Sequence, residues 1–378
     1  MNRSLLHIGA AAAALTFASV AARAASQYEI KPLDSLADTS DVYVRGVNNA
    51  GQIVGYNVDV NGTSHGVLWD ATGVHELPKI GVNAGSEAYR INNNGQIVGK
   101  AMADTNQNHA TVWTVGAGGA IAAQDIGTLP GGAFSFANDI NDNGVVAGSS
   151  KATKGQHAFT WTLSGGMVDN GSQAPAANSA IAGWNGINNS GLLVGTSYVI
   201  LSPYKASMGH VGDAQPTQMS PAGQFSNGMA LAVNDAGTMV GWQSAASGGS
   251  PQAAIFNGDG TFQGLGLLGL TDSWAEDVNE NGLIVGRAFG DPDGNGFQTK
   301  AFVWENGVMS DLLPLLSDGT GWTQLFEAEA VNNNGTIVGA GVYNGVITGF
   351  VLTPVPEPTT VGIVTCALGA LAMRRRRV

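Results

Sequence analysis

The segment Ile91-Asn92-Asn93-Asn94-Gly95-Gln96-Ile97-Val98-Gly99 decides the fold, because its pattern recurs along the chain. An aliphatic residue precedes an Asn-x-x-Gly turn, and an aliphatic pair then leads to a second glycine. The turn residues tolerate a positive φ, so the pattern predicts two short strands joined by a tight hairpin. It begins at seven asparagines, to which we assign a structural role in the repeat: Asn48, Asn92, Asn141, Asn188, Asn234, Asn279 and Asn332.

Each repeat contains two further strand signals. A third strand is visible in His157-Ala158-Phe159-Thr160-Trp161, and aliphatic segments such as Asp125–Leu129, Leu265–Leu268 and Asp311–Leu313 predict a fourth. No segment keeps a 3.6-residue period, which excludes a mainly helical chain. Four antiparallel strands in about 47 residues match the size of one propeller blade.

The two ends of the repeat region complement each other. Tyr28–Leu36 is a fourth-strand segment with no repeat before it, and Thr348–Leu352 is a third strand with no fourth strand after it. We therefore predict an all-β, seven-bladed β-propeller of four-stranded antiparallel blades over residues 25–354, closed by the N-terminal strand. The alternative is a β-solenoid of seven repeats, which needs no such complement. Residues 199–226 fit the repeat least well, with His210 expected at the start of a degenerate third strand.

Composition narrows the function classes. The chain has 55 glycines in 378 residues, 12% charged residues, 44% hydrophobic residues and a net charge of −12. Ordinary hydrophobicity excludes an acidic disordered chain, and the acidic balance argues against nucleic acid as a partner. The single cysteine, Cys366, excludes a disulfide framework.

Residues 1–24 have the order of a secretory signal peptide. Arg3 precedes an apolar stretch from Leu5 to Ala22, and small residues follow. We expect cleavage between Ala24 and Ala25. A buried alanine-rich helix is the alternative.

The last 24 residues have the features of a second targeting segment. Pro356-Glu357-Pro358 precedes an apolar run, Thr359–Met373, of about 22 Å as a helix, which is short for a permanent membrane span. A basic cluster ends the chain: Arg374, Arg375, Arg376 and Arg377. Residues 355–378 resemble the PEP-CTERM sorting signal of Gram-negative bacteria. The resemblance implies recognition by an exosortase, only transient contact with the inner membrane through the C-terminal transmembrane helix, and export to the cell surface or extracellular matrix. A simple tail anchor is the alternative.

The repeats resemble the extracellular HAF-repeat family. The tripeptide His157-Ala158-Phe159, the segment Ile126–Gly132 and the Asn-x-x-Gly turns carry the resemblance, which spans roughly residues 28–353. It implies an exported protein, often with the same C-terminal signal, and no general activity.

Four histidines are expected at the start of third strands: His65, His109, His157 and His210. A structural role within each blade is favoured over a ring of ligands around one ion. No catalytic residue is predicted, because the chain has no nucleophile elbow and no zinc-protease motif.

Calcium is the one cofactor hypothesis. Asp291, Asp293 and Asn295 place oxygen atoms at positions 1, 3 and 5 of a loop, like the first half of an EF-hand, but Phe302 stands at position 12. The alternative is an ordinary surface turn, for which Asp, Asn and Gly are typical.

The tryptophans fall into two groups. Trp69, Trp113, Trp161 and Trp304 share a repeat position and are expected in the blade cores. Trp274 and Trp322 are expected before first strands, where an exposed ring could stack on a sugar.

These observations favour a non-enzymatic, exported β-propeller with a binding or structural role in the surface or exopolysaccharide matrix, linked to biofilm. The alternatives are a carbohydrate-active propeller enzyme, either a glycan lyase or a hydrolase, and a protein-interaction scaffold.

Overall fold

The computed structural model describes residues 27–82, 85–172, 180–200, 202–219, 227–244 and 249–356. The predicted signal peptide with Ala24 and Ala25, and the predicted tail from Glu357 onward, lie outside these residues. Within them the chain is all-β, and its only helices are two 3₁₀ turns, η1 (Ala117–Gly119) and η2 (Leu313–Leu315). Neither is long and apolar enough to cross a membrane.

The strands repeat in sets of four. The first strands are β2 (Thr39–Val47), β6 (Ser86–Ile91), β10 (Ser135–Ile140), β14 (Ala180–Ile187), β18 (Gly228–Val233), β22 (Asp272–Val278) and β26 (Trp322–Val331). The second strands are β3 (Ile53–Asp59), β7 (Gln96–Met102), β11 (Val146–Lys151), β15 (Leu192–Val199), β19 (Met239–Ser244), β23 (Ile284–Gly290) and β27 (Ile337–Tyr343). The third strands are β4 (Ser64–Asp70), β8 (Asn108–Val115), β12 (Gln156–Thr162), β16 (Lys205–His210), β20 (Pro251–Phe256), β24 (Gln298–Glu305) and β28 (Val346–Pro354). The fourth strands are β5 (Gly73–Glu76), β9 (Ile121–Asp125), β13 (Gly166–Asp169), β17 (Thr217–Gln218), β21 (Phe262–Gly264), β25 (Val308–Asp311) and, from the other end of the chain, β1 (Tyr28–Pro32).

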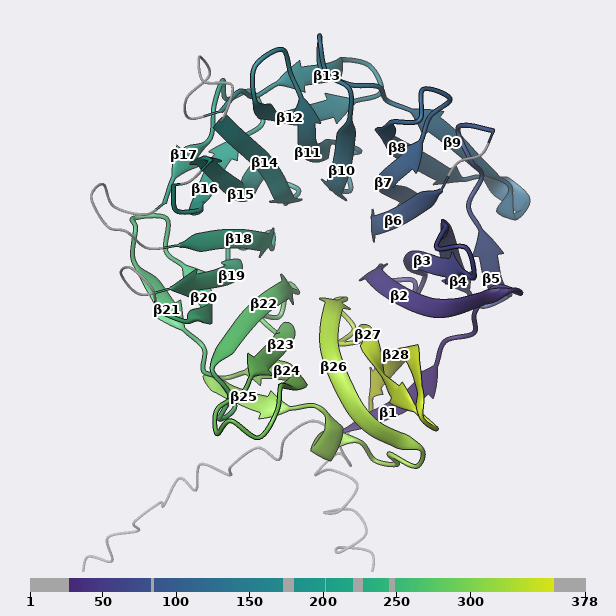
Figure 1. Ribbon diagram of the computed structural model, residues 1–378, viewed down its shortest axis with the longest axis vertical. Coiled ribbons are helices and arrows are strands. Elements are labelled where there is room, and N and C mark those ends of the chain that lie inside the picture. Colours follow the sequence, from purple (N-terminus) through teal and green to yellow (C-terminus); the bar gives the residue numbers. More distant parts are fainter. Residues whose placement is uncertain are drawn as a thin grey trace, which may run out of the picture.

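Most sets form a four-stranded antiparallel sheet, such as β6-β7-β8-β9. Two sets, β10 to β13 and β14 to β17, join into one eight-stranded sheet through a parallel bridge between Gln156 and Ile181. β1 pairs with β28 from Tyr28 opposite Pro354 to Pro32 opposite Phe350, which gives the sheet order β1-β28-β27-β26. The sheets stand around a common centre with their first strands innermost (Figure 1).

The core is divided among the contacts between neighbouring sheets. The buried apolar residues form seven separate clusters. In one of them, Val54 and Leu68 of the first repeat pack with Ile97 and Trp113 of the second. Each sheet is therefore stabilised by the two sheets beside it.

The fourth repeat fills its core differently. β16 ends at His210, so the predicted place of His210 at the start of this strand is wrong. Opposite Leu193, where other repeats have a tryptophan such as Trp113, β16 has Gly209. Trp184 of β14 occupies the space, because a Cβ on Gly209 would lie 2.9 Å from its ring. The core aromatic has moved from the third strand to the first.

Three fourth strands, predicted at Asp125–Leu129, Leu265–Leu268 and Asp311–Leu313, were placed several residues too late, whereas β1 begins at Tyr28 as predicted. β9 ends at Asp125, where the predicted strand begins, and β21 and β25 show the same shift. The aliphatic residues that suggested a strand instead follow it and cover the core, as Leu129 and Leu312 do. The strands themselves are short and mostly exposed, so they lack a strong apolar signal.

Candidate functional site

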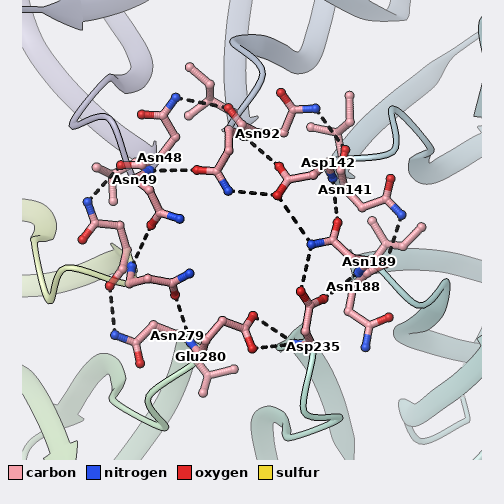
Figure 2. Close-up of a pocket in the computed structure, with 18 of the residues that line it drawn as sticks. Asn48, Asn49, Asn92, Asn141, Asp142, Asn188, Asn189, Asp235, Asn279 and Glu280 are labelled. Carbon is pink, nitrogen blue, oxygen red and sulfur yellow. Dashed lines mark hydrogen bonds between the residues drawn. The ribbon is translucent and has the colours of Figure 1, made fainter.

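The asparagine that opens each Asn-x-x-Gly turn joins its repeat to the next one (Figure 2). Its Nδ2 donates to the main-chain oxygen of the equivalent asparagine in the next repeat, at 2.9–3.1 Å. The series returns to its start, since Asn332 donates to Asn48. We call the seven asparagines of the repeat pattern the asparagine ring.

The same side chains also hold their own turns. Asn92 Oδ1 accepts hydrogen bonds from the main-chain N–H groups of Asn94 and Gln96, at 3.1 and 2.9 Å. One amide thus acts as donor between repeats and acceptor within a repeat, which an ionised aspartate, an acceptor only, cannot reproduce. All seven asparagines are only 3–5% exposed, so each lost partner would leave a buried polar group.

A second cycle follows the first. The residue after each asparagine donates its main-chain N–H to the side-chain oxygen of its equivalent in the next repeat, at 2.7–3.0 Å. Its members are Asn49, Asn93, Asp142, Asn189, Asp235, Glu280 and Asn333. The two cycles border a cavity of 160 Å³, room for about five water molecules. Because the bordering amides and carboxylates bond to one another, this end of the inner strands serves cohesion between repeats.

The structure explains why glycine is required at both glycine positions of the pattern. Gly95 closes the turn at φ 75°, and the equivalent glycines have φ between 75° and 84°. A Cβ on Gly99 would lie 2.0 Å from the main-chain oxygen of Glu87, and its equivalents would lie 1.9–2.1 Å from the corresponding oxygens. The first glycine is required by backbone conformation and the second by close approach of the paired strand.

Further along the same hairpins, the residue five positions before each asparagine differs from repeat to repeat. It lies about 15 Å along the strand from the turn. Each such residue is directly opposite a residue of the second strand. The pairs are Tyr43–Tyr56, Glu87–Lys100, Phe136–Ser149, Gly183–Thr196, Met229–Trp242, Trp274–Arg287 and Glu327–Ala340. We call these fourteen residues the variable ring.

Charged side chains gather where the seventh repeat meets its neighbours. Arg45 Nη1 lies 2.9 Å from Glu329 Oε1, and Arg287 Nη1 lies 2.6 Å from Glu327 Oε2. Arg287 Nε is also 3.4 Å from Glu276 Oε1. Three carboxyl groups therefore share two guanidinium groups. We call these five residues the carboxyl cluster.

Two carboxyl groups of the carboxyl cluster have raised pKa values. Burial and the nearby charge of Glu329 raise the pKa of both Glu276 and Glu327 to about 7, against the opposing effect of Arg287. The proximity of Glu329 is thus, after burial, the main reason why the pKa of Glu327 is raised. Burial alone would lower the pKa of Arg45, but Glu329 raises it above its usual value. Carboxyl groups with such raised pKa values are typical of functional sites.

Aromatic rings flank the carboxyl cluster on both sides. Tyr43 stacks on Tyr56 at 4.7 Å between ring centroids, and the Arg45 guanidinium lies 5.9 Å from the Tyr56 centroid. On the other side Trp274 stacks on Trp242 at 5.6 Å, and the Arg287 guanidinium lies 4.7 Å from the Trp274 centroid. The two aromatic pairs and the carboxyl cluster thus form one continuous arc along four repeats.

Several polar atoms of this arc are buried without a hydrogen-bond partner. They are the Arg45 Nε, Trp242 Nε1 and Trp274 Nε1 donors and the Glu276 Oε1 acceptor. A buried polar atom without a partner costs free energy, so the arc keeps donors and an acceptor that a ligand could satisfy.

The sequence anticipated only part of this arc. Trp274 belongs to it, although Trp242 and Arg287 already contact its ring. Trp322 is 7% exposed and packs on Tyr343 and Phe350, so its proposed role as a sugar platform is wrong. Tyr43, 38% exposed, was missed. Comparing the residue five before each asparagine across the repeats would have found it.

Three of the four histidines bind carboxylates of their own sheets. Nδ1 of His65 lies 2.8 Å from Glu76, that of His109 lies 2.8 Å from Asp125, and that of His157 lies 3.0 Å from Asp169. Each acidic partner is on the fourth strand of the same sheet. These three histidines therefore connect strands within a sheet.

The predicted calcium loop lies between β23 and β24 and is exposed. Asp293 accepts hydrogen bonds from the main chain and the side chain of Asn295, at 3.2 and 2.9 Å, and these bonds lower its pKa. Asp291 accepts one from the Gly296 N–H at 3.3 Å. In the part of the chain that the structure describes, no three His, Cys, Asp or Glu side chains are placed to hold a metal ion. Calcium binding here stays a prediction.

Solved structures share the fold. An oligogalacturonate lyase from Vibrio parahaemolyticus aligns with a TM-score of 0.56 and 8% identity over 88% of this chain and 98% of its own. An oligogalacturonate lyase in complex with manganese aligns with a TM-score of 0.51 and 11% identity over 88% of this chain and 99% of its own. At these identities the likeness shows a propeller-like fold alone. No family model matches the chain, and no curated protein does.

Proposed function

We propose that the chain is a closed seven-bladed β-propeller, exported from a Gram-negative cell, that binds a glycan through the arc formed by the two aromatic pairs and the carboxyl cluster. The observation that carries the binding role is the combination of flanking aromatic rings with buried, unpartnered polar atoms. Sugars present apolar C–H faces that pack on aromatic rings and hydroxyl groups that donate and accept hydrogen bonds. The arc offers both kinds of contact.

Closure into seven blades is supported by two features. β1 supplies the fourth strand of the sheet that contains β26, β27 and β28. The asparagine ring runs through all seven repeats and returns from Asn332 to Asn48. An open solenoid would leave the first and last repeats without such a contact.

The proposed export and matrix role rest on the predicted signal peptide, the predicted C-terminal sorting tail and the HAF-repeat resemblance. The Val355 N–H donates to the Gln27 carbonyl at 2.8 Å, so the two ends of the described domain lie side by side. We expect the exosortase to act on the tail there. Replacing Arg374–Arg377 with alanine should stop release of the protein from the cell envelope, as measured by immunoblotting of cell fractions. Unchanged release would contradict the sorting role.

Glycan binding is tested with an array followed by calorimetry on the purified chain. Tyr43→Ala should weaken binding at least about tenfold, the loss expected when a buried contact is truncated. Phe262→Ala is the matched control, because Phe262 is 41% exposed but lies on the outer strand β21. Equal affinities for both variants would place the ligand elsewhere.

A carbohydrate-active enzyme is the second candidate. The observation that favours it is the raised pKa of about 7 for Glu276 and Glu327, which suits general acid–base chemistry at neutral pH. Incubation with the glycan found on the array separates the two functions. Product release would support an enzyme, and binding without turnover supports a matrix-binding protein.

A further inference from the structure

The inner hairpins carry more carboxyl groups than cations. Among the described residues, the carboxyl groups on these strands are Asp41, Asp59, Glu87, Asp139, Asp272, Glu276, Asp277, Glu327 and Glu329, and the cations are Arg45, Arg90, Lys100, Lys151 and Arg287. Asp41, Asp59, Asp272 and Lys151 lie at the strand ends far from the asparagine turns.

Three of the carboxyl groups are fully engaged away from the arc. Glu87 accepts a hydrogen bond from the Tyr89 hydroxyl at 3.0 Å and lies 3.1 Å from Lys100. Asp139 and Asp277 each accept two main-chain N–H groups at 2.8–2.9 Å, one of them from the next repeat. Within the carboxyl cluster, by contrast, three carboxyl groups face two guanidinium groups.

Within the carboxyl cluster, Glu276 has the weakest partner. Glu329 and Glu327 each have a guanidinium nitrogen within 2.9 Å, whereas the contact of Glu276 with Arg287 is 3.4 Å and its Oε1 makes no hydrogen bond. Arg287 is shared by two carboxyl groups and also covers Trp274. Among the described residues, Glu276 therefore has no cation of its own: it shares Arg287 with Glu327, and Arg90 acts on it only through its charge.

We infer that the arc takes an amino sugar, whose ammonium group supplies the missing cation beside Glu276 while its ring packs against the flanking aromatic residues. This inference rests on the proposed glycan binding and specifies the class of glycan. The side chains of Glu276, Glu327, Arg287 and Arg45 are 13%, 20%, 29% and 33% exposed, so a ligand can reach the edge of the carboxyl cluster, although Glu276 Oε1 itself is buried. An ammonium ion near aromatic rings also gains cation–π attraction.

Proton release distinguishes an ammonium group from a neutral hydrogen-bond donor. Below pH 7 the carboxyl cluster holds a proton in place of the missing cation, because the pKa of Glu276 and of Glu327 is about 7. The surrounding groups that set this balance are Glu329, Arg45, Arg90 and Arg287. A bound ammonium group favours the ionised carboxylate and should expel about one proton per complex at pH 6.

The test compares a β-1,4-linked glucosamine tetramer with its N-acetylated counterpart, which differs in charge. Isothermal titration of the full chain at pH 6, in two buffers of different ionisation enthalpy, gives affinity and proton release together. We expect the glucosamine tetramer to bind at least about tenfold tighter, the ratio typical of one charge-assisted hydrogen bond, with release of about one proton.

Glu276→Gln should remove most of this preference and reduce the proton release, whereas Glu29→Gln, the same change on exposed strand β1, should leave both unchanged. The proton count on the unaltered chain remains decisive if Glu276→Gln does not fold. Equal or tighter binding of the N-acetylated tetramer, or binding without proton release, overturns the inference and leaves glycan binding standing. If neither tetramer nor any array glycan binds, both proposals fall.

Discussion

The two ends of the seven inner hairpins follow opposite rules. At the turn, every repeat has the same asparagine, buried and bonded to the next repeat. About 15 Å away on the same strands, no two repeats carry the same pair of residues. The polar contacts that every repeat makes with the next are thus located at one end, while the other end holds charges, aromatic rings and unpartnered polar atoms that differ from repeat to repeat.

Free energy explains why these two properties separate. Buried polar groups without partners are costly, and the arc contains several. The asparagine ring and the seven apolar clusters between sheets supply stability that does not depend on the variable ring. A site with unsatisfied groups can therefore persist in a rigid frame.

The largest loss of stability should come from adding a side chain to the second glycine of the pattern, where the paired strand lies very close. Gly99→Ala places a Cβ 2.0 Å from the main-chain oxygen of Glu87, and the strand pair must separate to admit it. We expect a loss of about 4 kcal/mol in the free energy of unfolding, or failure to fold. Gly116→Ala is the control, since its nearest atom would be 3.4 Å away, and urea titration measures both. Similar losses for the two variants would contradict the steric argument.

The next effect should come from removing one donor of the asparagine ring. Asn141→Asp keeps the acceptor of the turn but sets a carboxylate oxygen against the Asn188 carbonyl, where Nδ2 donated at 3.0 Å. We expect a loss of about 3 kcal/mol, because the position is buried. Asn143→Asp is the matched control: its Nδ2 donates to the Asn189 carbonyl at 2.9 Å on the exposed rim, and its loss should stay below about 1 kcal/mol. If the two substitutions reduce the free energy of unfolding equally, burial is not the reason why the asparagine ring stabilises the fold.

The repeat pattern predicted what depends on local backbone chemistry. Asn-x-x-Gly reports a turn, so the strand residues beside it were placed correctly, as in β6 and β7. The far ends of first strands were not: Trp274 and Trp322, expected before these strands, lie within β22 and β26. The hydrogen bond from Asn92 to Asn141 joins residues 49 positions apart and could not be predicted from the sequence. The turn alone already accounts for an asparagine at position 92, so nothing in the sequence indicates a second role.

The arc was largely hidden for the opposite reason: Tyr43 comes from the first repeat, Glu276 and Arg287 come from the sixth, and none of the three matches a repeated pattern. Trp184 shows a third case, in which a core residue changes strand while the filled volume is kept.

The free energy of unfolding should depend on pH through the carboxyl cluster, which lies away from the asparagine turns. An unfolded glutamate ionises near pH 4.3, whereas the pKa of Glu276 and Glu327 in the fold is about 7. Between these values the folded chain binds more protons, so the carboxyl cluster stabilises the fold at low pH and this contribution is lost as pH rises to 7. We expect the chain to lose about 2 kcal/mol more between pH 5 and pH 8 than Glu276→Gln does, by urea titration. The Glu29→Gln chain should keep the slope of the unaltered protein, and a slope unaffected by Glu276→Gln would argue against a buried carboxyl cluster.

The smallest effect should come from a variable-ring pair within the hairpin that carries Asn92. Lys100 lies 3.1 Å from Glu87 and 5.8 Å from the centroid of Phe136, but both charged side chains are about one-fifth exposed. Such ion pairs contribute little, and the Tyr89 hydroxyl still donates to Glu87 when the lysine is gone. Lys100→Met should therefore change the free energy of unfolding by less than about 1 kcal/mol, whereas Asn92→Ala in the same hairpin should cost about 2 kcal/mol or more by urea titration. A large loss for Lys100→Met would mean that the variable ring also holds the sheets together, and its diversity would then need a structural explanation in place of a ligand.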